Sequence, residues 1–337
     1  MKENKRKRGR KVKTRFNIKI FLLGLVFMIA FVGITSPILI LYGPYDTLRK
    51  TAISTVLATR HKYLITDMFS QQEIDKFLGV TESSGKEEVQ DIKKVSIKNR
   101  GSNDVSCQEI HTDRFDGFLV KISNPTKVKV AMTKYLYKKG QKTSEMAEDH
   151  NAIAAINGGA FVDKSSNGTA FAGTGAEPGG FVVSGGKVIY PKQEDLKTVY
   201  NVVAFTEDGH LIVGDKSLGE LKSMKVKEAM CFRRPNLIIN GKPQITNRME
   251  EGLNPRTAVA QTGDGTVLFL VIDGRKATKL GASLYDVQKI FLEYGAVNAG
   301  CLDGGYSSTL YYEGEVINSP NAWDGERSVA TAFYVEE

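Results

Sequence analysis

One apolar stretch near the N-terminus constrains the folding of this chain more than any other feature. Residues 20–45 contain no charged side chain, and about 20 apolar residues suffice for a helix to cross a bilayer. Residues 1–19 carry ten Lys or Arg side chains and a single Glu. Because basic residues stay on the cytoplasmic side, the chain after Tyr45 is expected outside the membrane. We therefore predict a basic cytoplasmic tail at 1–19 and a transmembrane anchor at 20–42.

A cleaved signal peptide is the other interpretation of this stretch. The apolar core is long and no clear A-x-A site follows it, which favours an uncleaved anchor. Pro37 is compatible with a membrane helix, because its surroundings can satisfy the freed backbone groups. We therefore expect a single-pass protein of the cell membrane, with its N-terminus in the cytoplasm.

The positive charge of the chain is confined to the tail. The formal net charge is +8, whereas residues 1–19 alone carry ten positive charges and one negative charge. Residues 20–337 are therefore close to neutral, so the high pI belongs to the tail and does not indicate a nucleic-acid surface. We expect a membrane partner through the N-terminal helix and no nucleic-acid partner, and the oligomeric state stays open.

The three cysteines indicate neither a zinc site nor a disulfide framework. Cys107, Cys231 and Cys301 show no C-x-x-C spacing and do not cluster with the four histidines. An odd number leaves at least one thiol unpaired in a monomer, and the pairing of the others stays open.

Residues 43–104 predict an extracellular stalk or linker. Thr47 to Arg60 is compatible with a helix, and Ser70-x-x-Glu73 resembles a capping box before another. The polar stretch from Thr81 to Asp104 is rich in Ser, Lys, Glu and Asn, which is typical of a flexible spacer.

Residues 105–337 predict one α+β domain, a mixed sheet with flanking helices, preceded by the transmembrane helix. Phe118 to Ile122 and Val128 to Met132 alternate as strands do. The clearest helix runs from Ser283 to Tyr294, because Ser283-x-x-Asp286 opens it and apolar residues follow on one face.

Three apolar segments each end in a polar side chain followed by glycine. In CLDGGYSST (301–309) the apolar run ends at Asp303, and the other two ends are Asn157-Gly-Gly and Asp273-Gly-Arg275. Convergence of such strand ends is typical of a ligand site. The alternative for each is an ordinary turn, in which the side chain bonds its own backbone.

No motif demands a cofactor. Asp273, Asp303 and Glu177 together are suitable oxygen ligands for Ca²⁺ or Mg²⁺, but the chain has no D-x-D-x-D loop and no nucleotide-binding glycine motif. We expect that no cofactor is required, and a Ca²⁺ or Mg²⁺ site stays open.

Five segments, taken in order, resemble the motifs of the phosphodiester glycosidase family. They are INGGAF (156–161), NPRTAVA (254–260), VIDGR (271–275), GASLYDVQKIFLEYGAVNAGCLDGGYSST (281–309) and ERSVATAFYV (326–335). The resemblance covers residues 105–337. The family includes the uncovering enzyme, an N-acetylglucosamine-1-phosphodiester alpha-N-acetylglucosaminidase. The chain looks like a bacterial, membrane-anchored member of this family. Tyr306 departs from it, standing where many relatives have a third glycine, and Ala160-Phe161 replaces a commoner pair of aromatics.

The resemblance implies an extracellular hydrolase that cleaves the anomeric C–O bond of a sugar-1-phosphodiester. Its partner would be such a phosphodiester in an envelope polysaccharide or exopolysaccharide. The implied catalytic residues are Asp303, Asp273 and Glu177. The implied substrate-binding residues are Asn157, Gly158, Gly159, Arg256, Gly304, Gly305, Tyr306, Ser307, Ser308 and Arg327.

These residue types suit the implied chemistry. Arg256 or Arg327 would grip the phosphate with two hydrogen bonds, glycine amides would cradle its oxygens, and a carboxylate would face the oxocarbenium-like transition state. Structural ion pairs of the two arginines with Asp273 or Asp303 are the alternative. A non-catalytic glycan-binding or scaffold protein in polysaccharide biosynthesis is the alternative function. The sugar, the attacking acid and the stereochemical outcome stay open.

Overall fold

The computed structural model describes residues 17–57, 63–78, 88–162, 174–248, 251–276, 278–322 and 325–337. The chain divides into two units, Met1–Asp46 and Thr47–Glu337, and each is described by itself. Most of the predicted basic tail (1–16) lies outside the described residues, as do 58–62 and 79–87 of the predicted stalk.

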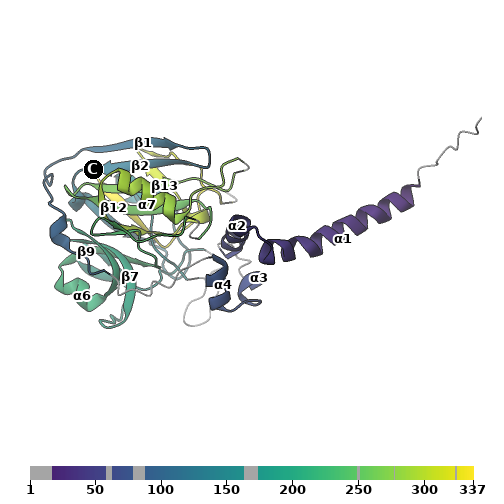
Figure 1. Cartoon of the computed structure of the whole chain (residues 1–337). Helices are drawn as coiled ribbons and strands as arrows, with labels where there is room; N and C mark the ends of the chain where they lie inside the picture. Colours follow the sequence, from purple (N-terminus) through teal and green to yellow (C-terminus); the bar gives the residue numbers. More distant parts are fainter. Residues whose placement is uncertain are drawn as a thin grey trace, which may run out of the picture. The chain divides into compact units, whose positions relative to one another are not determined.

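The first unit contains one long apolar helix, α1 (Ile18–Tyr42), at the position predicted for the anchor (Figure 1). The Asn17 side chain caps it by accepting hydrogen bonds from the amides of Lys19 and Ile20. By length and composition α1 is able to cross a membrane, and a signal sequence would have the same properties.

The second unit is built on three sheets whose strand pairings are all antiparallel within the described residues. The first has the order β1 (Val105–His111), β2 (Asp116–Ile122), β13 (Val267–Ile272), β12 (Arg256–Thr262), β14 (Ala296–Cys301), β10 (Ile238–Ile239) and β11 (Lys242–Pro243). The second has β16 (Glu315–Val316), β15 (Leu310–Tyr312), β4 (Ala152–Asn157), β17 (Thr331–Glu336) and β3 (Val128–Met132). The third has β6 (Lys187–Tyr190), β5 (Val182–Ser184), β9 (Val226–Phe232), β7 (Val199–Thr206) and β8 (Leu211–Ser217).

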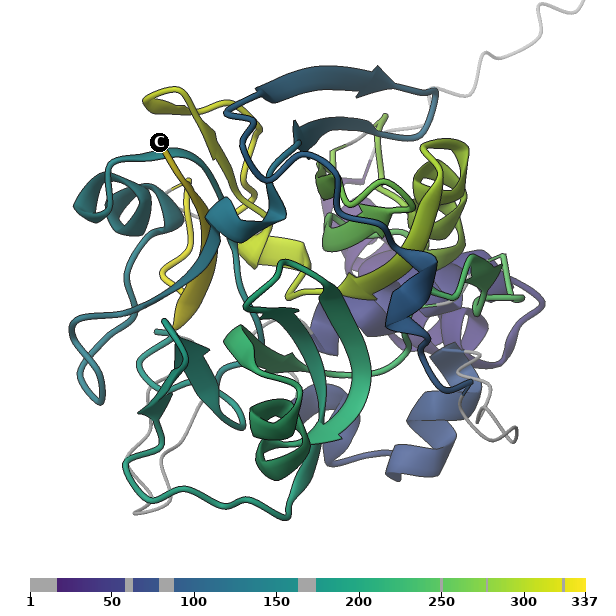
Figure 2. The ribbon, with the colours of Figure 1, turned by 90° about the vertical axis from the view of Figure 1, so that its left-hand side faces the viewer.

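The α+β prediction is confirmed, but the strands form three antiparallel sheets where one mixed sheet was expected. Tight turns such as Gly185-Gly186 join neighbouring strands, and such turns produce antiparallel pairs. Figure 2 shows the blue strands β1 and β2 at the top, the green strands of the third sheet at the bottom and the yellow β17 between them.

The three sheets share one apolar core. Phe205 from the third sheet and Phe269 from the first both contact Phe333 of the second, at ring-centroid distances of 5.7 and 6.3 Å. On the other face of the first sheet, α7 (Leu284–Glu293) covers β12 and β14. The predicted capping box is confirmed, since Ser283 and Asp286 bond reciprocally at its start.

Two short helices complete the packing of these sheets. The helix α5 (Thr143–Asp149) buries Met146 and Ala147 against the second sheet. The helix α6 (Leu218–Ser223) buries Leu218 and Leu221 against the third. The single 3-10 turns are η1 (Ile92–Lys94), η2 (Pro125–Lys127) and η3 (Gly305–Ser307).

The segment predicted as a stalk packs against the domain where it is described. It forms α2 (Asp46–Leu57), α3 (Tyr63–Thr66) and α4 (Gln71–Leu78), and the Ser70–Glu73 capping box is present. Ile53, Ile74 and Leu78 are buried. Burial of these apolar side chains favours association of the helices with the domain through the hydrophobic effect.

Residues 88–104, expected to belong to a flexible spacer, are also held against the domain. The Gln90 side chain donates to Leu211 O at 2.6 Å and accepts from Val213 N at 3.0 Å. The amide of Asp91 donates to Asn240 Oδ1 at 2.7 Å. The polar composition of this stretch thus serves specific hydrogen bonds to β8 and to the turn after β10.

Candidate active site

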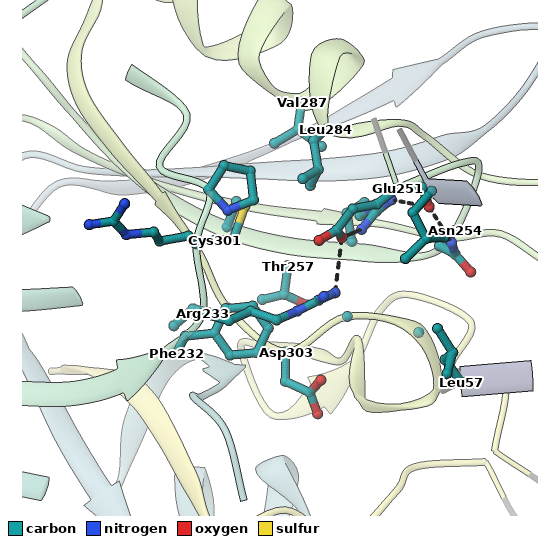
Figure 3. A pocket seen from close by; sticks show the side chains of 18 of the residues that line it. Leu57, Phe232, Arg233, Glu251, Asn254, Thr257, Leu284, Val287, Cys301 and Asp303 are labelled. Carbon is teal, nitrogen blue, oxygen red and sulfur yellow. Dashed lines mark hydrogen bonds and ion pairs between the residues drawn. The ribbon is translucent and has the colours of Figure 1, made fainter. Parts of the chain in front are cut away.

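A cavity of about 250 Å³ lies where several strands of the first and third sheets end (Figure 3). Its polar lining is Arg233, Arg234, Asn254, Glu251, Arg256, Thr257, Arg275 and Asp303. Its apolar lining includes Leu57, Leu78, Phe232, Leu284, Val287, Cys301 and Leu302. Charged and apolar groups therefore meet in one cavity, as in many small-molecule sites.

The antiparallel register brings these residues together. Arg256 at the start of β12 pairs with Ile272 at the end of β13, and Ala258 pairs with Cys301 at the end of β14. The segments that follow β13 and β14 therefore emerge beside the start of β12. The predicted convergence of the Asp303 strand end with neighbouring strand ends has its origin in this register.

Asp303 follows β14 and lines the cavity. Its Oδ2 accepts a hydrogen bond from Ser307 Oγ at 2.6 Å. Desolvation raises the pKa of Asp303, and the Ser307 hydrogen bond and the charges of Arg327, Arg233 and Arg275 act in the opposite direction. A carboxyl whose proton is held more tightly than usual is suited to proton transfer.

Asn157 ends β4 and lies beside Asp303 as predicted, but its side chain is fully buried. Its Nδ2 donates to Asp303 O at 2.6 Å, and its Oδ1 accepts from Thr257 Oγ1 at 2.7 Å and from Thr309 N at 3.1 Å. These contacts fix the backbone that carries Asp303. The Asn157 side chain therefore holds the Asp303 backbone, and its amide group is directed to protein atoms.

Three of the four glycine amides predicted to cradle phosphate donate to the protein itself. Gly158 N bonds Thr331 O, Gly159 N bonds Thr331 Oγ1 and Gly305 N bonds Pro255 O. A Cβ on Gly159 would lie 2.2 Å from Cys231 O, so this glycine allows β4 to approach β9. The amide of Gly304 makes no hydrogen bond within the described residues.

Arg256 is buried and its hydrogen bonds all go to protein acceptors. It donates to the Glu251 carboxylate at 3.0 Å and to the carbonyl oxygens of Ala282, Glu251 and Gly252. Glu251 is also paired with Arg233 at 2.9 Å, and Figure 3 shows this pair with Asp303 pointing away from it. The alternative of a structural ion pair thus fits Arg256, with Glu251 as its partner.

Arg275, two residues beyond Asp273, is the cation that sequence reasoning missed. Its Nε and Nη1 are buried and find no hydrogen-bond partner in the described part of the chain, while Nη2 donates to Asn254 Oδ1 at 3.1 Å. Its guanidinium lies 4.5 Å from the ring centroid of Tyr306. Desolvation lowers the pKa of Arg275. A desolvated guanidinium with unused donors is suited to bind an anion.

Arg327, Asp273 and Glu177 do not line the cavity. Arg327 lies 4.7 Å from the ring centroid of Phe161, and its charge lowers the pKa of Asp303. Asp273 is buried and accepts from Asn318 Nδ2 at 2.9 Å and from Ser319 N at 3.0 Å, which fixes the 318–319 loop.

Glu177 is buried beside Tyr190, whose hydroxyl donates to Oε1 at 2.6 Å. Its Oε2 has no partner among the described residues. Burial and the hydrogen bond to Glu177 raise the pKa of Tyr190. The structure therefore brings Glu177 together with Tyr190 and does not bring it to Asp303.

The Ser308 hydroxyl contacts another side chain, and the cysteines are free thiols. Ser308 Oγ lies 3.2 Å from Thr257 Oγ1. The three cysteines are not disulfide-bonded, and burial raises the pKa of Cys301, which lines the cavity, to about 12. A thiol of that pKa is protonated at neutral pH and is a poor nucleophile. No group of three His, Cys, Asp or Glu side chains suited to a metal occurs in the described ranges.

Comparison with known proteins gives a consistent result. The family model described as phosphodiester glycosidase matches residues 150–336. A stretch of 83 residues, 24% of this chain and 13% of the relative, is 44% identical to the SPbeta prophage-derived uncharacterized protein YomE of Bacillus subtilis (strain 168). A stretch of 97 residues is 32% identical to N-acetylglucosamine-1-phosphodiester alpha-N-acetylglucosaminidase of Bos taurus and covers 27% of this chain and 18% of that protein. The chain therefore matches less than a fifth of the length of either relative.

The fold is also similar to a solved structure. The catalytic domain of the zebrafish N-acetylglucosamine-1-phosphodiester alpha-N-acetylglucosaminidase, auto-inhibited by its pro-peptide, matches with a TM-score of 0.58 and 19% identity. The match covers 72% of this chain and 87% of that one. At this level of identity the match concerns the fold, which positions the strand ends described above.

Proposed function

The chain belongs to the phosphodiester glycosidase family, and on that premise we propose that it hydrolyses the anomeric C–O bond of a sugar-1-phosphodiester. The observation that carries this proposal is the presence of Asp303 and Arg275 in the lining of one cavity. A carboxylate and a desolvated guanidinium with unused donors match the two charges that develop when this bond breaks.

Arg275 would receive the departing phosphate. A phosphate monoester is a good leaving group, so stabilisation of its charge matters more than protonation of its oxygen. The unpartnered Nε and Nη1 of Arg275 supply two donors for phosphate oxygens. The face of Tyr306 holds the guanidinium in place through a cation–π contact.

Asp303 would face the anomeric carbon, where positive charge develops. Glycosidase transition states resemble an oxocarbenium ion, which a carboxylate stabilises. Because desolvation raises the pKa of Asp303, its ionised form is a stronger base than an exposed carboxylate. Asn157 and Ser307 hold this group by its backbone carbonyl and its carboxylate.

The cellular setting is part of the same proposal. The apolar helix α1, preceded in sequence by the basic residues 1–19, supports a single-pass anchor with the domain outside the cell. The substrate would then belong to a cell-envelope glycan or an exopolysaccharide. No cofactor is required by the chemistry of Asp303 and Arg275.

Turnover by the full-length protein in detergent tests the proposal. The methyl ester of N-acetylglucosamine-1-phosphate should release free sugar, and Asp303→Asn should abolish release while the protein stays folded by circular dichroism. Asp195→Asn, the same substitution at an exposed carboxylate, is the matched control and should keep full activity.

Two results would contradict the proposal. Full activity in Asp303→Asn would make this residue part of an ordinary turn. Binding without cleavage of several different sugar-1-phosphodiesters by the unmodified protein would instead support a glycan-binding or scaffold role.

A further inference from the structure

The cavity has an apolar wall that the hydrolytic chemistry does not use. Leu57 at the end of α2 and Leu78 at the end of α4 line it together with Phe232. A phosphate presents polar groups only, and a sugar ring presents one small C–H face, so the wall is larger than these two groups need. An apolar surface in a binding cavity indicates an apolar part of the ligand.

The domain holds this wall in place. In α2, Ile53 is buried and Thr51 Oγ1 accepts from Leu253 N at 3.4 Å. A Cβ on Gly252 would meet the backbone of Lys50 and Thr51 at 2.9 Å, so α2 closely contacts the 251–253 loop. Glu251 in that loop binds the two cavity arginines Arg233 and Arg256. The apolar wall and the charged wall are thus parts of one connected structure.

The sequence between the two leucines carries exposed apolar side chains. Tyr63, Leu64 and Met68 are 50%, 51% and 69% exposed. These side chains follow the apolar helix α1 by about 20 residues along the chain. Exposed aromatic and apolar residues close in sequence to a membrane anchor are typical of contact with a lipid surface.

Given the phosphodiester hydrolysis proposed above, on which this rests, we propose that the substrate is a lipid-linked sugar-1-phosphodiester. Its second ester joins the phosphate to a long-chain alcohol, whose first carbons lie against Leu57 and Leu78. Water adds to the anomeric carbon, the anomeric C–O bond breaks, and the products are the free sugar and the lipid phosphate monoester. Arg275 binds the phosphate between the polar and apolar parts.

The test compares two esters that differ only in the aglycone. Full-length protein in phospholipid vesicles is given the methyl or the butyl ester of N-acetylglucosamine-1-phosphate, and kcat/KM is measured for each. We expect the butyl ester to be favoured by about tenfold, the gain from burial of roughly two methylene groups. Leu57→Asn and Leu78→Asn should each bring the butyl-to-methyl ratio close to one.

Leu196→Asn, the same substitution at an exposed leucine outside the cavity, should keep the tenfold ratio. Partition of the butyl ester into vesicles is the same for every variant, so a change in the ratio reports on the cavity. Leu57 is only half-buried, so its variant decides the outcome if Leu78→Asn fails to fold.

The outcomes separate the two proposals. Hydrolysis of both esters at equal kcat/KM would overturn the lipid-linked substrate and leave the glycosidase proposal standing. A tenfold butyl-to-methyl ratio that persists in both leucine variants would show that Leu57 and Leu78 do not bind the aglycone. Failure to hydrolyse either ester would overturn the proposed function, and the lipid-linked substrate with it.

Discussion

At the scale of single residues, two arginines from neighbouring strand ends differ in how their hydrogen-bond donors are used. Arg256 donates its hydrogen bonds to the Glu251 carboxylate and to three carbonyl oxygens. Arg275 keeps two buried N–H groups without a described partner. A buried cation with a complete set of acceptors stabilises structure, whereas one with unused donors gains by binding an anion. The two residues should therefore respond differently to substitution.

Arg275→Lys should lower kcat by about a hundredfold, because a single ammonium replaces two directed donors to the phosphate. The melting temperature should change little, since the charge is retained. Arg256→Gln should instead lower the free energy of unfolding by about 3 kcal/mol, because it leaves Glu251 without its buried partner. Thermal denaturation and kinetics of both variants check this, and equal stability losses would contradict it.

Ser307→Ala should shift the pH dependence of turnover. The Ser307 hydroxyl stabilises the ionised carboxylate and thereby lowers the pKa of Asp303. Its removal raises that pKa further, so the acid limb of kcat/KM should move to higher pH. Ser308→Ala is the control, because its hydroxyl contacts Thr257 instead. An acid limb that moves to lower pH, or moves equally in both variants, would exclude this coupling.

The sequence predicts single residues well only where their role depends on local context. Asp303 and Asn157 each end an apolar run, and the structure places them in contact. The contacts of Asp273 were not predictable, because its partners Asn318 and Ser319 lie about 45 residues away in the chain. Likewise, Glu251 belongs to no motif, so nothing in the sequence distinguishes the paired Arg256 from Arg275.

At the scale of elements, short-range signals were reliable and packing partners were not. Both predicted capping boxes, at Ser70 and Ser283, are present because they involve residues three positions apart. The helices α2 and α4 were expected in a stalk, and their apolar faces instead pack on the domain. Helix formation follows from local sequence, but the surface that covers an apolar face depends on the whole fold.

The contact between β4 and β9 offers a test at this scale. Gly159→Ala should lower the free energy of unfolding by about 1–3 kcal/mol, because its Cβ would lie 2.2 Å from Cys231 O, a backbone atom. Gly101→Ala is the matched control, because an added Cβ there would have no atom from outside its chain neighbours within 4 Å. This substitution should change the free energy of unfolding by less than about 0.5 kcal/mol. Chemical denaturation of both variants measures the difference, and similar values would contradict the close approach.

At the scale of the whole molecule, the described part of residues 47–337 is one folded unit, and its first helices contribute residues to the cavity. The sequence predicted an apolar N-terminal helix and an α+β domain, and both are present. The domain boundary predicted at residue 105 leaves out residues that bond to the domain. The sequence could not show this, because a spacer and a segment held by hydrogen bonds have the same polar composition.

The contacts of Gln90 have a consequence for self-association. Its side chain satisfies backbone groups of β8, the outermost strand of the third sheet. Exposed sheet edges invite pairing with a second chain, and proteins protect them by covering the edge. A fragment of residues 105–337 should therefore elute as aggregates in size-exclusion chromatography, whereas residues 88–337 should elute with less association. Equal elution of the two fragments would show that other contacts protect this edge. Stronger association of the shorter fragment would show that the segment carrying Gln90 prevents β8 from pairing with a second chain.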